Sequence, residues 1–245
     1  LLSRYNCPLK ELRMSGADVD DEECGDLMKR LVENKSVEVL DLSHNLIGAK
    51  EAMNIVMPEF DTGPEMIGEF LKDERCMLVV LNLAWNSIQK DSARQLGEAL
   101  GDNKTLHEID LSYNAFGDMG GQAIGDMLHR NTGLVKIDLS NNNINHRAAF
   151  TIACGLRHNA TLCELNLRGN PIGDIGGRSL MQVPIDIGEH ITVHLEKCSM
   201  TLEDRTFQIY KDTHLPKHPM DEPKNPDKEG EKMKRIFQIM SLVAV

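Results

Sequence analysis

Two aromatic side chains occupy the same position in neighbouring copies of a repeated segment. Trp85 and Tyr113 lie 28 residues apart, and each stands directly before an asparagine, while His44 and Asn141 hold this position in the flanking copies. We expect the position to lie at the edge of an inner wall of strands, outside the core. Aromatic faces attract Lys and Arg, and aromatic residues often dominate protein interfaces. The chemistry indicated is recognition of a basic partner, with packing on a neighbouring loop as the alternative.

Acidic side chains recur at two further positions of the repeat. Strands in such a wall lie roughly 5 Å apart, so equivalent residues form columns in which like charges repel. A basic partner would relieve this repulsion; alternatively, the carboxylates are solvated or bonded to neighbouring Ser and Asn. One column holds Arg13, Asp41, Asn82, Asp110, Asp138, Asn166 and His194, and the other holds Glu11, Val39, Val80, Glu108, Lys136, Glu164 and Thr192. We predict that partners contact Asp41, Glu108, Asp110, Asp138 and Glu164 together with the aromatic position.

Catalytic chemistry has little support in the sequence. A Ser–His–Asp arrangement, a Walker phosphate loop or a metal cluster cannot be assembled, so we predict no catalytic, cofactor-binding or metal-binding residues and no enzyme. The six cysteines form no C-x-x-C pair and match no zinc spacing. We expect them to be buried free thiols in a reducing compartment.

A repeat of 28 residues fixes all of these positions. Its apolar skeleton is clearest in residues 106–133, and the same skeleton returns in the two following copies. The pattern L-x-x-L-x-L-x-x-N-x-L is typical of leucine-rich repeats. Seven units are predicted, and they begin at Leu9, Val37, Leu78, Leu106, Leu134, Leu162 and His190.

Each unit is expected to form a short strand, an asparagine turn and a helix. The alternation around L-x-L predicts the strand, and Ala123, Ile124, Met127 and Leu128 fall on one helical face. Stacked copies of the turn asparagine can bond neighbouring backbone groups as a ladder. Asp91, Asp118 and Asp174 are expected to cap helices. The predicted fold is an α/β solenoid, or horseshoe, with parallel strands on the concave face and helices on the convex face.

Three segments are predicted along the chain. Residues 1–210 form the solenoid, 211–230 a Pro-rich polar linker, and 231–245 a C-terminal amphipathic helix. The third unit starts 41 residues after the second, which indicates 13 inserted residues near 51–66, where Pro58 and Pro64 would break a helix. Ile236, Phe237 and Met240 lie on the apolar face of the last helix. That helix would dock on the solenoid, on a partner or on a membrane.

Composition narrows the class of partner. The net charge of −11 opposes nucleic-acid binding, which needs clustered Lys and Arg. The aromatic content of 4% suits a solenoid core of Leu, Ile and Val. No apolar run approaches the roughly 18 residues of a membrane span. We therefore expect a cytoplasmic protein, without a membrane span, whose partners are other proteins with basic or mixed surfaces.

Several segments carry a family resemblance. VEVLDLSHNLIG, HEIDLSYNAFG, VKIDLSNNNIN and CELNLRGNPIG resemble the ribonuclease-inhibitor-like class of leucine-rich repeats over residues 9–200. That class includes inhibitors, GTPase-activating proteins, immune receptors, actin-filament capping proteins and axonemal subunits. The phrases GDNKTL, HRNTGL and RHNATL are similar to those of ciliary and flagellar repeat proteins, including a subunit of the nexin–dynein regulatory complex.

The resemblance implies a non-catalytic scaffold for protein–protein interaction. We expect a structural subunit of a hetero-oligomeric intracellular assembly, with the axoneme of a cilium or flagellum as its setting. One alternative is a regulator that activates a small GTPase, for which the resemblance implies an exposed arginine after a strand, here Arg168. The other is the ligand-sensing repeat domain of an immune-type receptor.

Overall fold

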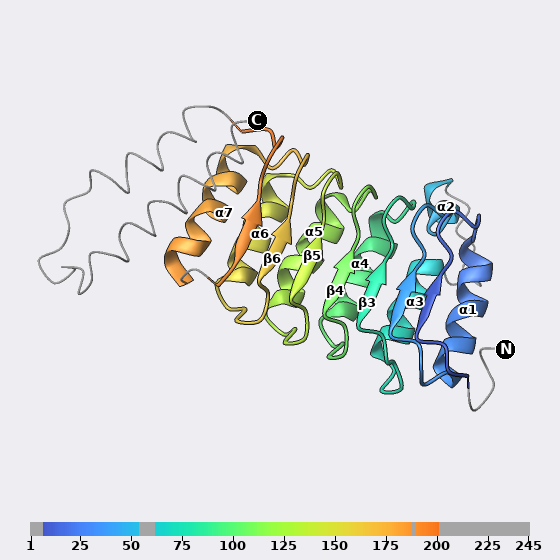
Figure 1. Ribbon diagram of the computed structural model, residues 1–245. Coiled ribbons are helices and arrows are strands. Elements are labelled where there is room, and N and C mark those ends of the chain that lie inside the picture. The colour runs from blue at the N-terminus through green and yellow to red at the C-terminus, as the bar shows by residue number, and fades with distance from the viewer. Residues whose placement is uncertain (1–6, 54–61, 188–189, 201–245) are drawn as a thin grey trace, which may run out of the picture.

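Seven short parallel strands form one sheet in the order of the chain (Figure 1). The computed structural model describes residues 7–53, 62–187 and 190–200. Pairing joins Leu40 to Leu81 and Ile109 to Ile137, so equivalent residues of successive repeats lie side by side. The strands are β1 (Glu11–Arg13), β2 (Val39–Asp41), β3 (Val80–Asn82), β4 (Glu108–Asp110), β5 (Lys136–Asp138), β6 (Glu164–Asn166) and β7 (Thr192–His194). The predicted α/β leucine-rich repeat solenoid is confirmed.

The helices cover one face of this sheet and leave the other face open (Figure 1). Each repeat helix packs on the next one along the chain. Ala123, Ile124, Met127 and Leu128 are all buried, as their helical spacing predicts. The helices are α1 (Asp21–Glu33), α2 (Ala49–Ala52), α3 (Gly63–Lys72), α4 (Lys90–Leu100), α5 (Gly117–Leu128), α6 (His146–Leu156) and α7 (Gly173–Ile187). Among the described residues, no helix has the length and apolarity that a membrane span requires.

The turn asparagines form the predicted ladder. Each side-chain amide donates to a backbone carbonyl of the preceding repeat, for example from Asn142 to Leu111 at 2.8 Å and from Asn170 to Leu139 at 2.9 Å. The side-chain amide oxygen of Asn170 also accepts hydrogen bonds from the backbone N–H groups of Asn142 and Ile144. Backbone polar groups that neither strand nor helix can pair are thereby satisfied inside the stack.

A second asparagine ladder lies where the helices end. Asn103, Asn131 and Asn159 are buried, and each accepts two backbone N–H groups of the following turn. Asn131 donates to Leu100 O at 2.7 Å, and Asn159 donates to Leu128 O at 3.0 Å, so both bond the last helical carbonyls of the preceding repeat. These asparagines belong to the phrases GDNKTL, HRNTGL and RHNATL. The recurrence of these phrases therefore has a structural cause within the fold.

The inserted residues of the second unit precede its repeat helix. Helix α3 packs between α1 and α4, in the place of a repeat helix, and α2 is the added element. The predicted range 51–66 therefore overlaps α3, whose first turn contains Pro64. Proline at this position starts a helix because its missing N–H would have no helical partner. The expected break at Pro64 is thus a helix start, and Pro58 lies outside the described residues.

Buried carboxylates join the inserted segment to its neighbours. Asp21 accepts the backbone N–H groups of Gly48, Lys50 and Gly63 at 2.7, 3.0 and 2.8 Å. Glu51 accepts those of Asp91 and Ser92 at the start of α4. Unpaired N–H groups at helix N-termini favour negative charge. These carboxylates from other repeats therefore satisfy N–H groups at the starts of α2 and α4, which lack a side-chain cap of their own, and one further N–H group at the start of α3.

The predicted caps at Asp91, Asp118 and Asp174 are incorrect. All three lie in the first turn of their helices, where the negative charge still suits the helix dipole. The residues that stand at the cap position of α4 and α5 are Gln89 and Phe116, and neither bonds the helix with its side chain. Side-chain caps occur instead at Asp20 for α1 and Asn145 for α6.

The two ends of the described stack differ from its middle. Leu9, Leu12 and Met14 of the first unit are only half-buried. In the last unit His190 is exposed and Ile191 is buried beside it, so His190 does not fill its predicted core position. Cys198 takes the asparagine position as predicted, and its Sγ donates to Leu167 O at 3.1 Å. The predicted linker and C-terminal helix, with Ile236, Phe237 and Met240, lie outside the described residues.

Candidate functional site

Three rings form a continuous stack in the turns that follow strands β2, β3 and β4. The ring centroids of His44 and Trp85 lie 5.4 Å apart with 12° between the planes, and those of Trp85 and Tyr113 lie 4.0 Å apart at 10°. Trp85 and Tyr113 are 49% and 43% exposed. Stacked aromatic pairs are worth about 1 kcal/mol beyond the area they bury. The position predicted from the repeat therefore holds a pre-formed, solvent-facing row of rings, which we call the ring stack.

The backbone of the ring stack is held in the left-handed region. The φ angles are 55° at His44, 57° at Trp85 and 54° at Tyr113. The cause is the turn itself, because each of these N–H groups donates to a carbonyl of the next repeat, as Trp85 does to Ser112 at 2.9 Å. Such φ angles cost a non-glycine residue about 1–2 kcal/mol. Glycine fills the same position at Gly16 and Gly169. Asn141 and Lys197 share this backbone conformation without an aromatic ring, so the positive φ belongs to the turn of each repeat.

This strain gives a direct comparison of two variants at Trp85. Both Trp85→Gly and Trp85→Ala remove the ring, but only glycine adopts a φ of 57° without steric cost. We expect the glycine variant to be the more stable by about 1 kcal/mol in urea unfolding followed by circular dichroism. This order is the reverse of that in a helix, where alanine is favoured. Equal or greater stability of the alanine variant would contradict it.

The acidic residues line up in columns as predicted, but several of their carboxylates have hydrogen-bond or ion-pair partners within the repeats. Asp41, Asp110 and Asp138 each accept the backbone N–H of the serine two residues later, at 2.8–3.0 Å. The Glu164 carboxylate lies 3.3 Å from Lys136 Nζ. The alternative of bonds to neighbouring Ser and Asn therefore accounts for much of these columns. The Glu108 side chain is exposed, and its carboxylate forms no ion pair or hydrogen bond with the described residues.

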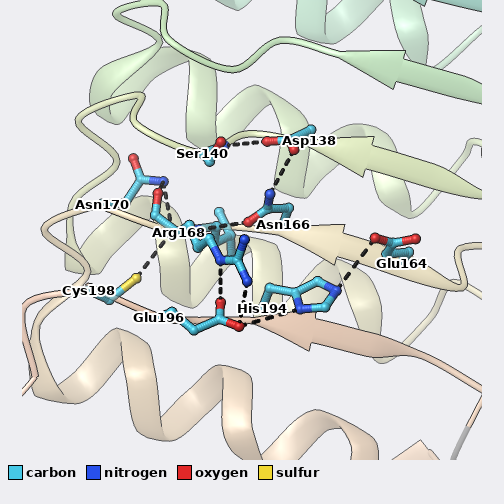
Figure 2. A network of polar contacts seen from close by, with 10 residues as sticks. Asp138, Ser140, Glu164, Asn166, Arg168, Asn170, His194, Glu196 and Cys198 are labelled. Atoms are coloured by element: carbon cyan, nitrogen blue, oxygen red, sulfur yellow. Dashed lines mark hydrogen bonds and ion pairs between the residues drawn. The ribbon is translucent and has the colours of Figure 1, made fainter. Parts of the chain in front are cut away.

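Arg168 belongs to a polar network at the C-terminal end of the open face (Figure 2). Its guanidinium donates twice to the buried carboxylate of Glu196, at 2.8 Å for each bond. His194 lies between Glu164 and Glu196, with nitrogen–oxygen distances of 3.5 and 3.8 Å. The hydrogen bonds from Arg168 hold the pKa of Glu196 below its ordinary value. Arg168 thus fastens the sixth repeat to the seventh and is not a free arginine.

We expect Arg168→Ala to loosen the last repeat. Glu196 would lose both charge-assisted bonds, at a cost of about 1–2 kcal/mol near neutral pH. Because the pKa of Glu196 is lowered in the fold, this stabilisation exists above the ordinary glutamate pKa and disappears as the pH falls through the folded value. The deficit of the variant in urea unfolding should therefore be full at pH 7 and should shrink as the pH is lowered and Glu196 becomes protonated. Arg147→Ala, at an exposed site on α6, is the control and should be near neutral.

Comparison with known proteins agrees with the repeat. A family model described as "Leucine Rich repeat" matches residues 33–55, 102–125 and 158–181. These three segments contain β2, β4 and β6 with the turns that follow them. The chain is a leucine-rich repeat protein. Repeats of this kind form protein–protein interaction domains.

The alignments with known relatives cover only part of this chain and a small part of each relative. This leucine-rich repeat protein is 29% identical over 110 residues to NACHT, LRR and PYD domains-containing protein 12 of Mus musculus, and 28% identical to that of Homo sapiens. The aligned residues are 45% of this chain and 9% of each relative, so the chain spans less than a tenth of the relatives it matches.

Two solved structures have a similar outline. Leiomodin-1 actin-binding site 2 matches with a TM-score of 0.47 and 16% identity, over 88% of this chain and 94% of that one. The C-terminal domain of tropomodulin from Caenorhabditis elegans also has a TM-score of 0.47 and 16% identity, over 64% and 87% of the two chains. Similarity at this level adds nothing to the fold assignment, which is based on the strands and repeats of the chain itself.

The six cysteines of this leucine-rich repeat protein form no disulfide bonds with one another, and three of them are buried. Cys24, Cys76 and Cys198 are buried, whereas Cys163 is exposed, contrary to the expectation for all six. Burial, together with the nearby Asp21 carboxylate, raises the pKa of the Cys24 thiol to about 12. A thiol in this state is a poor nucleophile and metal ligand. No group of three or more potential metal ligands occurs in residues 7–53, 62–187 and 190–200.

The sequence predicted which residues lie together but not the geometry in which they do so. Trp85, Tyr113 and His44 come together as expected, and Glu108 and Asp110 lie on the strand that leads to Tyr113. The Arg168–Glu196 pair was missed, although the two residues lie 28 apart and so occupy one column. The parallel stacking and the positive φ angles have no sequence signal beyond the glycines at equivalent positions.

Proposed function

We propose that this leucine-rich repeat protein binds other proteins through the ring stack and the adjoining carboxylates of Glu108 and Asp110. It acts as a non-catalytic scaffold, a structural subunit of a larger intracellular assembly. The observation that carries the proposal is the exposed stack of three rings. Because each ring is already held by its neighbour, a partner that packs on the stack immobilises few additional side chains.

The charge around the stack favours a basic or mixed partner surface. The whole chain has a net charge of −11. Beside the stack, Glu108 is exposed and Asp110 has one carboxylate oxygen that accepts no hydrogen bond among the described residues. A cationic group placed there would relieve the repulsion between neighbouring carboxylates. Asp41, Asp138 and Glu164 extend the acidic surface over the adjoining repeats.

The test replaces Trp85 and Tyr113 together by asparagine. Asparagine tolerates a positive φ, so the variant should retain its fold while losing both aromatic side chains. Affinity purification of the tagged protein from its native cells, with quantitative mass spectrometry, should show that the partners of the wild type fall by about tenfold or more. Phe150→Asn is the matched control, because Phe150 is 50% exposed on helix α6, away from the open face. Retention of every partner by the double variant would disprove the proposed contact surface.

The axonemal setting stays a prediction from the sequence. The phrases that suggested it contain the asparagines of the helix-end ladder, which the fold itself requires. The setting therefore gains no support from the structure. The GTPase alternative loses support, since Arg168 is engaged by Glu196.

A second candidate is the repeat domain of a receptor. It is favoured by the similarity to two mammalian proteins named for NACHT and PYD domains beside their repeats. Sequencing the complete transcript tests the receptor candidate against the scaffold. A NACHT-coding segment upstream would support the receptor, and its absence from the transcript would remove this candidate.

A further inference from the structure

The ring stack has two uncovered ring faces, and neither belongs to Trp85. His44 covers one face of Trp85 at 5.4 Å and Tyr113 covers the other at 4.0 Å. A cation binds an aromatic ring over its face, where the quadrupole is negative. Trp85 can therefore offer a partner only its ring edge. The faces that remain for a cation are the outer face of His44 and the outer face of Tyr113.

The space beyond each end of the stack is open. At the His44 end the next residue in the row is Gly16, and a Cβ there would meet nothing within 4 Å. At the Tyr113 end the next residue is Asn141. Its Oδ1 lies 2.3 Å from the place of a Cβ on Gly169, so the Asn141 side chain leans toward Gly169 and away from Tyr113. Neither end is closed by another ring.

Charge distinguishes the two ends. Next to the His44 end, Arg13 lies in register with Asp41 and forms an ion pair with Glu11 at 3.0 Å, so this end already holds a cation among its carboxylates. The Asp41 carboxylate is also engaged by Ser43, which donates through both its backbone N–H and its hydroxyl. At the Tyr113 end, strand β4 carries Glu108 and Asp110, and Asp138 lies in register with Asp110. Lys136 lies in register with Glu108, but it pairs with Glu164 on the following strand at 3.3 Å. The surplus of carboxylates is therefore larger at the Tyr113 end, and electrostatics favours a cation there over the His44 end.

We propose that the outer face of Tyr113 binds the guanidinium of an arginine on the partner, with Asp110 and Glu108 accepting its N–H groups. A guanidinium is flat and can stack on a ring while its edge donates to carboxylates, which a lysine ammonium cannot do. Trp85 supports Tyr113 from behind and does not touch the cation. This inference rests on the proposed function and specifies the partner group that the surface recognises.

The experiment uses the full chain and two unstructured peptides of equal charge, each with three arginines or three lysines separated by Gly-Ser. Isothermal titration calorimetry gives the dissociation constants. We expect the arginine peptide to bind about fivefold more tightly than the lysine peptide. Chemical-shift changes of the Tyr113 ring, assigned with the Tyr113→Asn variant, should accompany binding. Circular dichroism checks that each variant is folded.

Matched variants at the two ends locate the site. Tyr113→Asn should abolish the preference for arginine, while His44→Asn, at an equivalent position with the same backbone φ, should leave it intact. Equal binding of the two peptides by the wild type would overturn the inference, since charge alone would then explain the affinity. Loss of the preference in His44→Asn but not in Tyr113→Asn would overturn it as well.

The failure of this inference can be separated from that of the proposed function. If the Trp85 and Tyr113 double variant loses its cellular partners but the peptides bind alike, the contact surface stands and the arginine is wrong. If the arginine preference depends on Tyr113 but the double variant keeps every partner, the guanidinium site stands and the proposed contact surface is wrong.

Discussion

Gly155→Ala is expected to lower the free energy of unfolding by about 2 kcal/mol, although alanine is the better helix former by about 1 kcal/mol. Gly155 lies in α6 where that helix meets α5. A Cβ at Gly155 would stand 2.2 Å from the carbonyl oxygen of Gly125 and 2.9 Å from the Leu128 Cβ. The first contact is with backbone, which cannot rotate away as a side chain can. The two helices must therefore separate, and the stack beneath them must follow.

The chain contains its own control for this substitution. Gly25 lies in α1, and a Cβ there would meet the Met66 side chain at 3.4 Å, which is ordinary contact with a flexible group. Gly25→Ala should therefore stabilise the protein by roughly 0.5–1 kcal/mol through helix propensity. Urea unfolding monitored by circular dichroism measures both variants. If both alanines stabilise equally, the close approach of α5 and α6 has no energetic weight.

The repeat made most of the fold predictable. Once the 28-residue period is known, residues such as Asp110 and Asp138 must lie side by side, because the strands are parallel and in register. The same logic placed Tyr113 beside Trp85 and identified Cys198 as the seventh turn residue. Periodicity determines adjacency in a solenoid, whereas in most folds adjacency depends on unknown topology.

Structural features that do not recur every 28 residues were harder to predict from the sequence. The inserted segment breaks the spacing, and its place became clear only from Asp21, whose carboxylate bonds both Gly48 and Gly63. Ring orientation was also hidden, because the period fixes which residues are neighbours but not their side-chain torsions. The helix-end ladder did have a signal, since Asn103, Asn131 and Asn159 recur every 28 residues. That recurrence has its cause in backbone hydrogen bonding.

We expect Asn170→Ala to cause the largest decrease in the free energy of unfolding of any substitution considered, about 3–4 kcal/mol. Asn170 is 1% exposed, and its side chain bonds the backbones of two repeats. It accepts from Asn142 N and Ile144 N at 2.9 and 3.0 Å and donates to Leu139 O and Leu167 O at 2.9 Å each. Alanine leaves Asn142 N, Ile144 N and Leu139 O without these partners, whereas Leu167 O keeps the bond from Cys198 Sγ. Each unsatisfied buried group costs about 1–3 kcal/mol. Asn166→Ala, in the same repeat but only half-buried, should cost less than about 1 kcal/mol.

The seventh repeat suggests a variant of Asn170 whose stability should lie between those of the wild type and Asn170→Ala. Cys198 occupies the asparagine position there and donates from Sγ to Leu167 O at 3.1 Å, but a thiol is only a weak acceptor for the two N–H groups. Asn170→Cys should therefore keep the bond to Leu139 O and lose those from Asn142 and Ile144. Its stability in urea unfolding should fall between those of the wild type and Asn170→Ala. If cysteine and alanine are equally destabilising, accepting the two N–H groups carries the whole stabilisation; if cysteine matches asparagine, donation to the preceding repeat is sufficient.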